Sequence, residues 1–216
     1  MKGLLLAQYY SNFKNFYIYL MTGIILSIFL ILANFPNNKY LATILILAFV
    51  TSTALDFLKQ EEKVGWDKFQ NTLPISTNKI VQSHALFYLF TVSISIFVSF
   101  VLLFITKTNI IEIISITMVT FSIALQLYIY YLLTYILSSE RSSIIQFISF
   151  IFISFSYILF NTISLVIGAS IFGNGNNAIE NSLFLLVRSF IYMLISFIFF
   201  IIIYKLNILI RKSKEY

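Results

Sequence analysis

The chain has few residues that could perform chemistry within a membrane. An intramembrane protease or a lipid-processing enzyme needs a nucleophile, a metal site or a pair of acid and base groups. The sequence contains no cysteine, which excludes disulfides, thiolate metal sites and thiol catalysis. Its single histidine, His84, cannot form a zinc site without further ligands. We therefore predict no catalytic residue and no metal site, and we expect the chain not to be an enzyme.

The acidic residues do not indicate ion-driven transport either. Such transporters usually carry an acidic residue or a histidine near the bilayer midplane, but the eight acidic residues here map to loops or to the ends of apolar stretches. The pair Glu61–Glu62 is similar to that of glutamate-pair membrane proteases, but Trp66 stands where those enzymes have an arginine. We interpret the pair as a solvated charge cluster. The phosphate-binding motif GxxxxGK[ST] is also missing, so any ATP hydrolysis of that kind must come from another polypeptide.

The most distinctive local pattern lies in the longest polar segment, residues 59–83. Three apolar residues recur there at i, i+3 and i+7, after a glycine that ends the preceding helix and before a proline. The pattern consists of Gly65, Trp66, Phe69, Leu73 and Pro74, with Asp67 on the opposite face. It predicts a short amphipathic helix that docks into a groove of a soluble partner. The alternative is a helix that lies on the lipid surface.

Six apolar stretches surround this segment, and each is long enough to cross a bilayer of ~30 Å. We place the spans near residues 16–33, 41–57, 84–105, 110–137, 144–161 and 189–204. The hydrophobic fraction of 60% and the charged fraction of 10% leave almost nothing for a domain outside the membrane. The fold class is therefore all-α integral membrane, with residues 1–216 as a single transmembrane domain.

The basic residues predict the orientation. If the N-terminus is cytoplasmic, eleven of the 14 basic residues lie on that side, namely Lys2, Lys14, Lys59, Lys63, Lys68, Lys79, Arg141, Lys205, Arg211, Lys212 and Lys214. Only Lys39 and Lys107 fall outside, and Arg188 lies in or beside the sixth span. This bias predicts that both termini are cytoplasmic, and it accounts for the basic pI without nucleic-acid binding. The richness in Ile, Phe, Asn and Tyr is typical of an AT-rich bacterial genome, so we expect a bacterial cytoplasmic membrane.

Residues 1–17 predict a helix that lies along the membrane interface. Leu5, Leu6, Tyr9, Phe13 and Phe16 share one face, and Gln8, Ser11, Asn12 and Asn15 share the other, with Lys14 bordering it. The alternative is the frayed start of the first span. Near the inner end of the fourth span, we interpret Tyr128, Tyr130, Tyr131 and Tyr135 as part of an aromatic belt.

The final stretch is too long for two simple spans. Residues 144–204 exceed the ~40 residues that two spans need, and glycine and asparagine gather around Gly168 and residues 173–177. We predict a re-entrant hairpin, in which residues 162–172 and 178–187 form two short helices that dip into the outer leaflet. Arg188 would then start the sixth span and meet a substrate or a lipid headgroup. The alternative is two long, tilted helices.

The segment around Gly65 resembles a known family. Permease subunits of the ABC type-2 exporter family carry a closely similar E-K-x-G-W-D-x-[FY]…L-P-[IV]-[ST] segment between their second and third spans, and the predicted layout is similar along the whole chain. The resemblance implies a coupling helix that docks on a separate ATP-binding subunit. Its docking residues would be Gly65, Trp66, Asp67, Phe69, Leu73 and Pro74.

The same resemblance implies partners, cofactors and a substrate. Two copies of the ATP-binding subunit would bind ATP and Mg, while this chain would hold no cofactor itself, and a second permease, identical or homologous, would complete a dimer. The substrate path would run between facing second and fifth spans. Because that path is apolar, we expect export of amphipathic peptides or lipid-like molecules, as in the small permeases that export phenol-soluble modulins. The alternative is a membrane scaffold or immunity protein that binds a peptide without ATP.

Overall fold

Every element that the structure describes is a helix. The computed structural model describes residues 2–33, 38–66, 69–70, 75–137, 141–173 and 181–213. Its helices are α1 (Lys2–Leu32), α2 (Asn38–Lys63), α4 (Thr77–Ile105), α5 (Ile110–Leu127), α6 (Ile129–Leu137), α7 (Ser142–Phe172) and α9 (Ser182–Ser213). Six helical segments are long and apolar enough to cross a membrane, with α5 and α6 together forming one of them. The predicted all-α membrane fold is confirmed.

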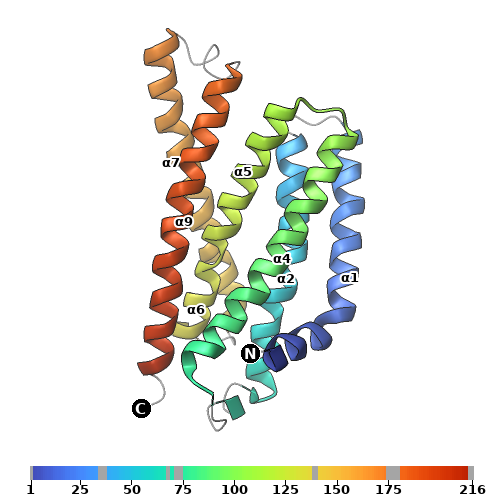
Figure 1. Cartoon of the computed structure of the whole chain (residues 1–216), viewed down its shortest axis with the longest axis vertical. Helices are drawn as coiled ribbons and strands as arrows, with labels where there is room; N and C mark the ends of the chain where they lie inside the picture. The colour runs from blue at the N-terminus through green and yellow to red at the C-terminus, as the bar shows by residue number, and fades with distance from the viewer. Residues whose placement is uncertain are drawn as a thin grey trace.

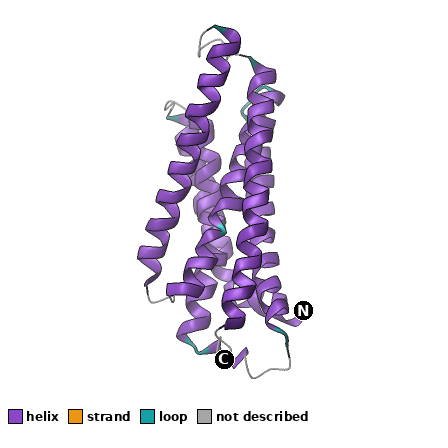
Figure 2. Cartoon of the chain, turned by 90° about the vertical axis from the view of Figure 1, so that its left-hand side faces the viewer, coloured by secondary structure: helices purple, strands orange, loops and turns teal. Residues whose placement is uncertain are grey.

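The helices run side by side along the long axis of the molecule (Figures 1 and 2). Helix α2 contacts α1, α4 and α5, while α9 packs along α5. The start of α1 and the end of α9 lie at the lower end of the molecule in Figure 1, where residues 69–70 also lie. Residues 69–70, between α2 and α4, therefore lie on the same side of the molecule as the start of α1 and the end of α9.

Polar and small residues mediate much of the packing between helices. The hydroxyl groups of Thr43 on α2 and Thr120 on α5 lie 3.0 Å apart, and Ser27 on α1 donates to the carbonyl oxygen of Ala42 at 2.8 Å. A Cβ on Gly23 would lie 3.3 Å from the Cβ of Phe49, so this glycine allows α1 to approach α2 closely. Large apolar side chains instead cover much of the outside. This arrangement suits a protein in lipid, where packing and hydrogen bonds hold helices together.

The first part of α1 lies across the lower end of the molecule before the helix turns along the bundle (Figure 1). The orientation of its faces differs from the prediction, because Gln8 and Asn12 are buried while Tyr10 and Phe13 are exposed. Gln8 donates a hydrogen bond of 3.2 Å to the hydroxyl group of Ser83 on α4. Gln8 and Asn12 of the predicted polar face thus meet the protein together with Phe16, while Tyr10 and Phe13 are left for lipid.

A break at Tyr128 divides the fourth span into α5 and α6. The hydroxyl group of Tyr88 donates to the carbonyl oxygen of Ala124, and the Tyr128 N–H turns to Gln126 instead. A side chain that occupies a helical carbonyl is a known cause of kinks. The interpretation of the tyrosines as an aromatic belt is wrong for the buried Tyr128, Tyr130 and Tyr131. They face the protein interior, where Tyr131 donates to the carbonyl oxygen of Ala54 at 3.1 Å.

The predicted re-entrant hairpin is not present in the described residues. Residues 162–172 continue α7 without a break, and α9 already begins at Ser182, before Arg188. Gly168 is buried within α7, so it does not break the helix, and Gly173 ends it with a positive φ of 76°. At 1.5 Å per residue, α7 is roughly 46 Å long. The alternative of two long helices therefore agrees with the structure, and residues 174–180 lie outside its described part.

Candidate functional site

The segment between α2 and α4 begins as the sequence predicts. Helix α2 ends at Lys63, and Gly65 has a φ of 69°, a conformation that glycine adopts at little cost. The ring of Trp66 packs on the ring of Phe69, with centroids 5.1 Å apart, and Phe69 is 49% exposed. Two aromatic side chains are thus presented together at the lower end of the molecule. The other predicted docking residues Asp67, Leu73 and Pro74 lie outside the described residues.

Glu61 is buried rather than solvated, in contrast to the prediction. Only 5% of the residue is exposed, and its carboxylate accepts a hydrogen bond of 2.7 Å from the side-chain amide of Gln70. The other carboxylate oxygen lies 3.1 Å from Nε2 of His84, as an ion-pair contact without the alignment of a hydrogen bond. Burial of a carboxylate requires such partners, because its charge is otherwise very costly to remove from water.

His84 and Arg211 extend this cluster into the helix bundle. Nδ1 of His84 lies 2.7 Å from the hydroxyl group of Tyr135 on α6. The guanidinium group of Arg211, near the end of α9, lies 5.6 Å from the centre of the Tyr135 ring. Arg211 also donates a hydrogen bond of 2.8 Å to the side-chain oxygen of Gln70. A cation above an aromatic ring is a favourable arrangement, worth more where water is excluded.

These contacts form a closed ring of side chains, which we call the polar ring. It consists of Glu61, Gln70, Arg211, Tyr135 and His84, from α2, residues 69–70, α9, α6 and α4. A carboxylate and a guanidinium group with opposite charges are joined through one neutral amide. The ring brings together the segment that presents Trp66 and four transmembrane helices.

A second cationic site lies at the other end of the molecule. Arg188 on α9 donates a hydrogen bond of 3.0 Å to the side-chain oxygen of Asn161 on α7. Beside it is a cleft of about 130 Å³, lined by Phe160, Ile163, Ser164, Ile167, Phe184, Val187 and Ile191. The neighbouring ends of α2 and α5 are joined by an ion pair of 3.0 Å between Lys39 and Glu112. An arginine beside an apolar cleft can hold an anionic group whose apolar part enters the cleft.

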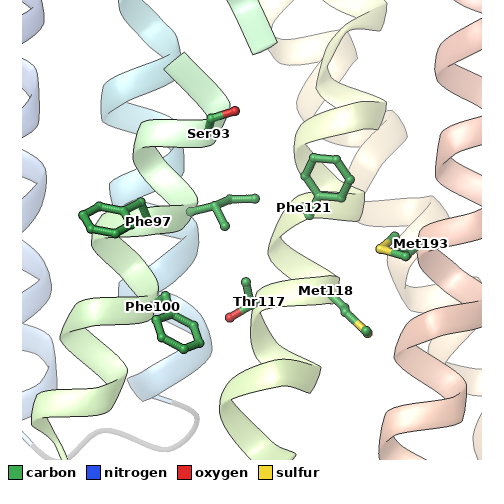
Figure 3. Close-up of a pocket in the computed structure, with 8 residues that line it drawn as sticks. Ser93, Phe97, Phe100, Thr117, Met118, Phe121 and Met193 are labelled. Carbon is green, nitrogen blue, oxygen red and sulfur yellow. The ribbon is translucent and has the colours of Figure 1, made fainter. Parts of the chain in front are cut away.

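A larger apolar groove of about 440 Å³ lies between α4, α5 and α9 (Figure 3). Its lining residues are Ser93, Ile96, Phe97, Phe100, Thr117, Met118, Phe121 and Met193. Figure 3 shows Phe97 and Phe100 on one helix and Phe121 and Met118 on the next, with Met193 at the far side. A charged side chain is missing from this lining, so the groove suits an acyl chain or an apolar peptide face.

The polar ring is the part of the site that sequence reasoning missed. His84 was placed at the edge of the third span, but it is buried two turns inside α4, which begins at Thr77. Among the residues that the structure describes, no three His, Asp or Glu side chains gather as metal ligands. The single histidine and the glutamate pair near span ends were the available signals, because ionisable groups in a membrane protein usually pair with one another.

The comparisons with known proteins agree with this architecture. A family model described as ABC-2 family transporter protein matches residues 3–210. Comparisons with curated proteins and with solved structures give no significant match. The match covers nearly the whole chain, including all six apolar helices and the segment around Trp66. The chain therefore belongs to the ABC-2 transporter family, as a membrane permease of an ABC transporter that works with an ATP-binding partner.

Proposed function

We propose that this chain is the membrane-spanning subunit of an ATP-driven exporter in a bacterial cytoplasmic membrane. A separate ATP-binding subunit docks on residues 65–74 of the polar segment 59–83, and both termini lie on the same cytoplasmic side. The observation that carries the proposal is that the rings of Trp66 and Phe69, directly after Gly65, pack against each other with centroids 5.1 Å apart. A membrane subunit that lacks an ATP-binding motif must receive its energy through such a surface.

The docking surface consists of Gly65, Trp66, Asp67, Phe69, Leu73 and Pro74. Gly65 allows the chain to leave α2, since its positive φ would strain any other residue. Trp66 and Phe69 supply apolar contact area, and aromatic residues contribute strongly to protein interfaces. Two copies of the partner would bind ATP and Mg, and their closure would displace the two docking surfaces of a permease dimer.

The second permease, identical or homologous, is expected to contact α7 and the exposed stripe of α2. Helix α7 is the least buried of the six spans, with 11% of its most apolar window buried within the chain. Helix α2 reaches the surface mainly along a stripe that includes Leu41, Ala48 and Ser52. A path between these helices would be apolar and nearly uncharged.

An amphipathic peptide or a lipid-like molecule is the substrate class that such a path suits, and phenol-soluble modulins are one peptide class of this kind. Arg188 would hold the anionic group of the substrate or of a lipid headgroup, beside the cleft between α7 and α9. The larger groove in Figure 3 opens to the bilayer and could accept the apolar part of a molecule that enters from lipid.

The proposal is tested by purification of the tagged chain from native membranes in mild detergent, with quantitative mass spectrometry. We expect a soluble ATPase at about one copy per permease, as a docked pair requires. Its recovery should be lost when Trp66 and Phe69 are both replaced by Ala. Val64→Ala is the matched control, because Val64 is apolar, 77% exposed and adjacent to the segment. Absence of an ATPase in several detergents would contradict the proposal.

The alternative is a scaffold or immunity protein that binds a peptide without ATP. A scaffold would keep its protective function in the Trp66→Ala and Phe69→Ala double variant, because it needs no docked ATPase. A transporter would lose export while its insertion into the membrane stayed intact. Resistance of cells to an amphipathic toxin peptide, compared between the double variant and Val64→Ala, separates the two functions.

A further inference from the structure

The side-chain amide of Gln70 joins the buried carboxylate of Glu61 to the partly buried guanidinium group of Arg211. Its nitrogen donates to Glu61 and its oxygen accepts from Arg211, at 2.7 and 2.8 Å. Only 1% of Gln70 is exposed, although the preceding Phe69 is 49% exposed. Rotation of the amide by 180° would place its oxygen against the carboxylate and its nitrogen against the guanidinium group. The two charges therefore determine both the position and the orientation of this side chain.

Through Gln70, the docking segment is tied to a helix to which it is not adjacent in the chain. Gln70 and Arg211 are 141 positions apart, whereas the segment is joined through the backbone only to α2 and α4. Arg211 is on α9, which packs along α5 for much of its length, and its neighbour in the ring, Tyr135, is on α6. A displacement of residues 66–70 must therefore either move the end of α9 or break the bonds of Gln70.

We propose that Gln70 is a positioning residue that links the docking segment to α9, so that movement of the ATPase reaches the sixth span directly. We call this link the Gln70 latch. The inference rests on the proposed function, since it assumes that an ATPase docks on Trp66 and Phe69. It adds a route of transmission that runs through side chains instead of through the backbone of α2 and α4.

The sole tryptophan of the chain provides a direct test of the latch. Trp66 packs on Phe69, and Phe69 precedes Gln70, so its fluorescence reports how firmly the segment is held. We expect Arg211→Ala, in the purified chain in lipid nanodiscs, to raise the acrylamide quenching constant of Trp66 about twofold, because the local opening of an unanchored segment exposes its side chains. Lys212→Ala removes an exposed charge from the same turn and should leave quenching unchanged.

A double variant separates a shared latch from two independent effects. If Arg211 acts through its contact with Gln70, adding Arg211→Ala to Gln70→Ala should not raise quenching beyond that of Gln70→Ala alone, which already removes the bonds to both Glu61 and Arg211. Should Gln70→Ala fail to purify as monodisperse protein, Gln70→Met takes its place, since it fills a similar volume but can neither donate to Glu61 nor accept from Arg211. That variant should raise quenching at least as much as Arg211→Ala. Wild-type quenching in a folded Arg211→Ala chain would overturn the latch.

The latch and the proposed function fail in different ways. An ATPase that co-purifies with a chain whose Trp66 does not respond to Arg211→Ala refutes the latch and supports the docking function. A Trp66 response in a chain that never recovers an ATPase supports the link between Gln70 and Arg211 but contradicts the docking function on which transmission to α9 depends. If the ATPase is recovered and Trp66 responds, ATP and vanadate added to the complex should change the reactivity of the cysteine that Ser213→Cys introduces on α9. Gln70→Ala should abolish that change. A change that persists in Gln70→Ala would overturn the latch.

Discussion

Glu61 is a buried carboxylate whose burial depends on contacts with other parts of the chain. Gln70 and His84 contact its two oxygens, and Arg211 balances its charge through the amide of Gln70. Removal of one partner from such a cluster costs more free energy than the whole cluster contributes to stability, because the remaining charge stays buried. The same reasoning explains why the residue could not remain in the solvated cluster that the adjacent glutamates suggested.

We therefore predict that Glu61→Ala lowers the free energy of unfolding by about 3 kcal/mol, through loss of the partner of Gln70 and His84. Titration with a denaturing detergent in mixed micelles measures this change. Lys63→Ala, two positions further along α2 and exposed, is the control and should leave the free energy of unfolding near the wild-type value. If Glu61→Ala changed the free energy of unfolding no more than Lys63→Ala does, Glu61 would be solvated, as the sequence suggested.

The ion pair between Lys39 and Glu112 should behave differently. Both side chains are about one-third exposed, at 33% and 39%, so water screens their attraction. Lys39→Ala is expected to alter the free energy of unfolding by less than about 1 kcal/mol. The same titration tests it, and a loss as large as that of Glu61→Ala would contradict the role that we assign to burial.

At the scale of elements, α1 shows that the buried side of a helix in a membrane protein need not be its apolar side. Leu4, Gln8, Asn12 and Phe16 follow one another at intervals of four and are all buried. Two of them are polar, and Gln8 is held by Ser83. Tyr10 and Phe13 face outward, but Phe16 of the predicted apolar face lies on the buried stripe with Gln8 and Asn12, so the predicted division into two faces is only partly correct.

This orientation predicts the environment of Tyr10, which is 72% exposed. In a Trp66→Phe background, a tryptophan placed by Tyr10→Trp should be quenched by lipids with brominated acyl chains and protected from aqueous iodide. Lys14→Trp, at a nearby exposed position, is the control. Gln8→Trp is not suitable because Gln8 is buried. Stronger quenching of Tyr10→Trp by iodide than by brominated lipid would contradict the assignment of this side of α1 to lipid.

The break at Tyr128 depends on Tyr88, whose hydroxyl group occupies the carbonyl of Ala124. Tyr88→Phe should lower the free energy of unfolding by about 1 kcal/mol, because a buried carbonyl loses its partner. Tyr10→Phe removes an exposed hydroxyl group and serves as the control in the same titration. An unchanged value for Tyr88→Phe would mean that the break has another cause.

At the scale of the whole molecule, the least buried helix is the expected contact with a second permease. Cysteine is missing from the sequence, so single cysteines can be introduced without background. Phe155→Cys on α7 should form a disulfide-linked dimer in membranes upon mild oxidation. Phe97→Cys is equally exposed, at 68% against 65%, but lies in the groove of Figure 3 and should stay monomeric. Cross-linking of Phe97→Cys alone would place the partner at the groove instead.

The sequence by itself determined the six spans, the break at Gly65 and the family resemblance, because hydropathy, glycine conformation and short motifs are local properties. It did not determine which face of each helix is buried, since lipid is as apolar as a protein core and the pattern of apolar residues no longer identifies the inside. The polar ring joins residues up to 150 positions apart, as from Glu61 to Arg211, and only tertiary packing brings them together. The length of α7 was likewise apparent only in the structure, where Gly168 stays helical although local propensity suggested a turn, because a helix in lipid satisfies its own backbone hydrogen bonds.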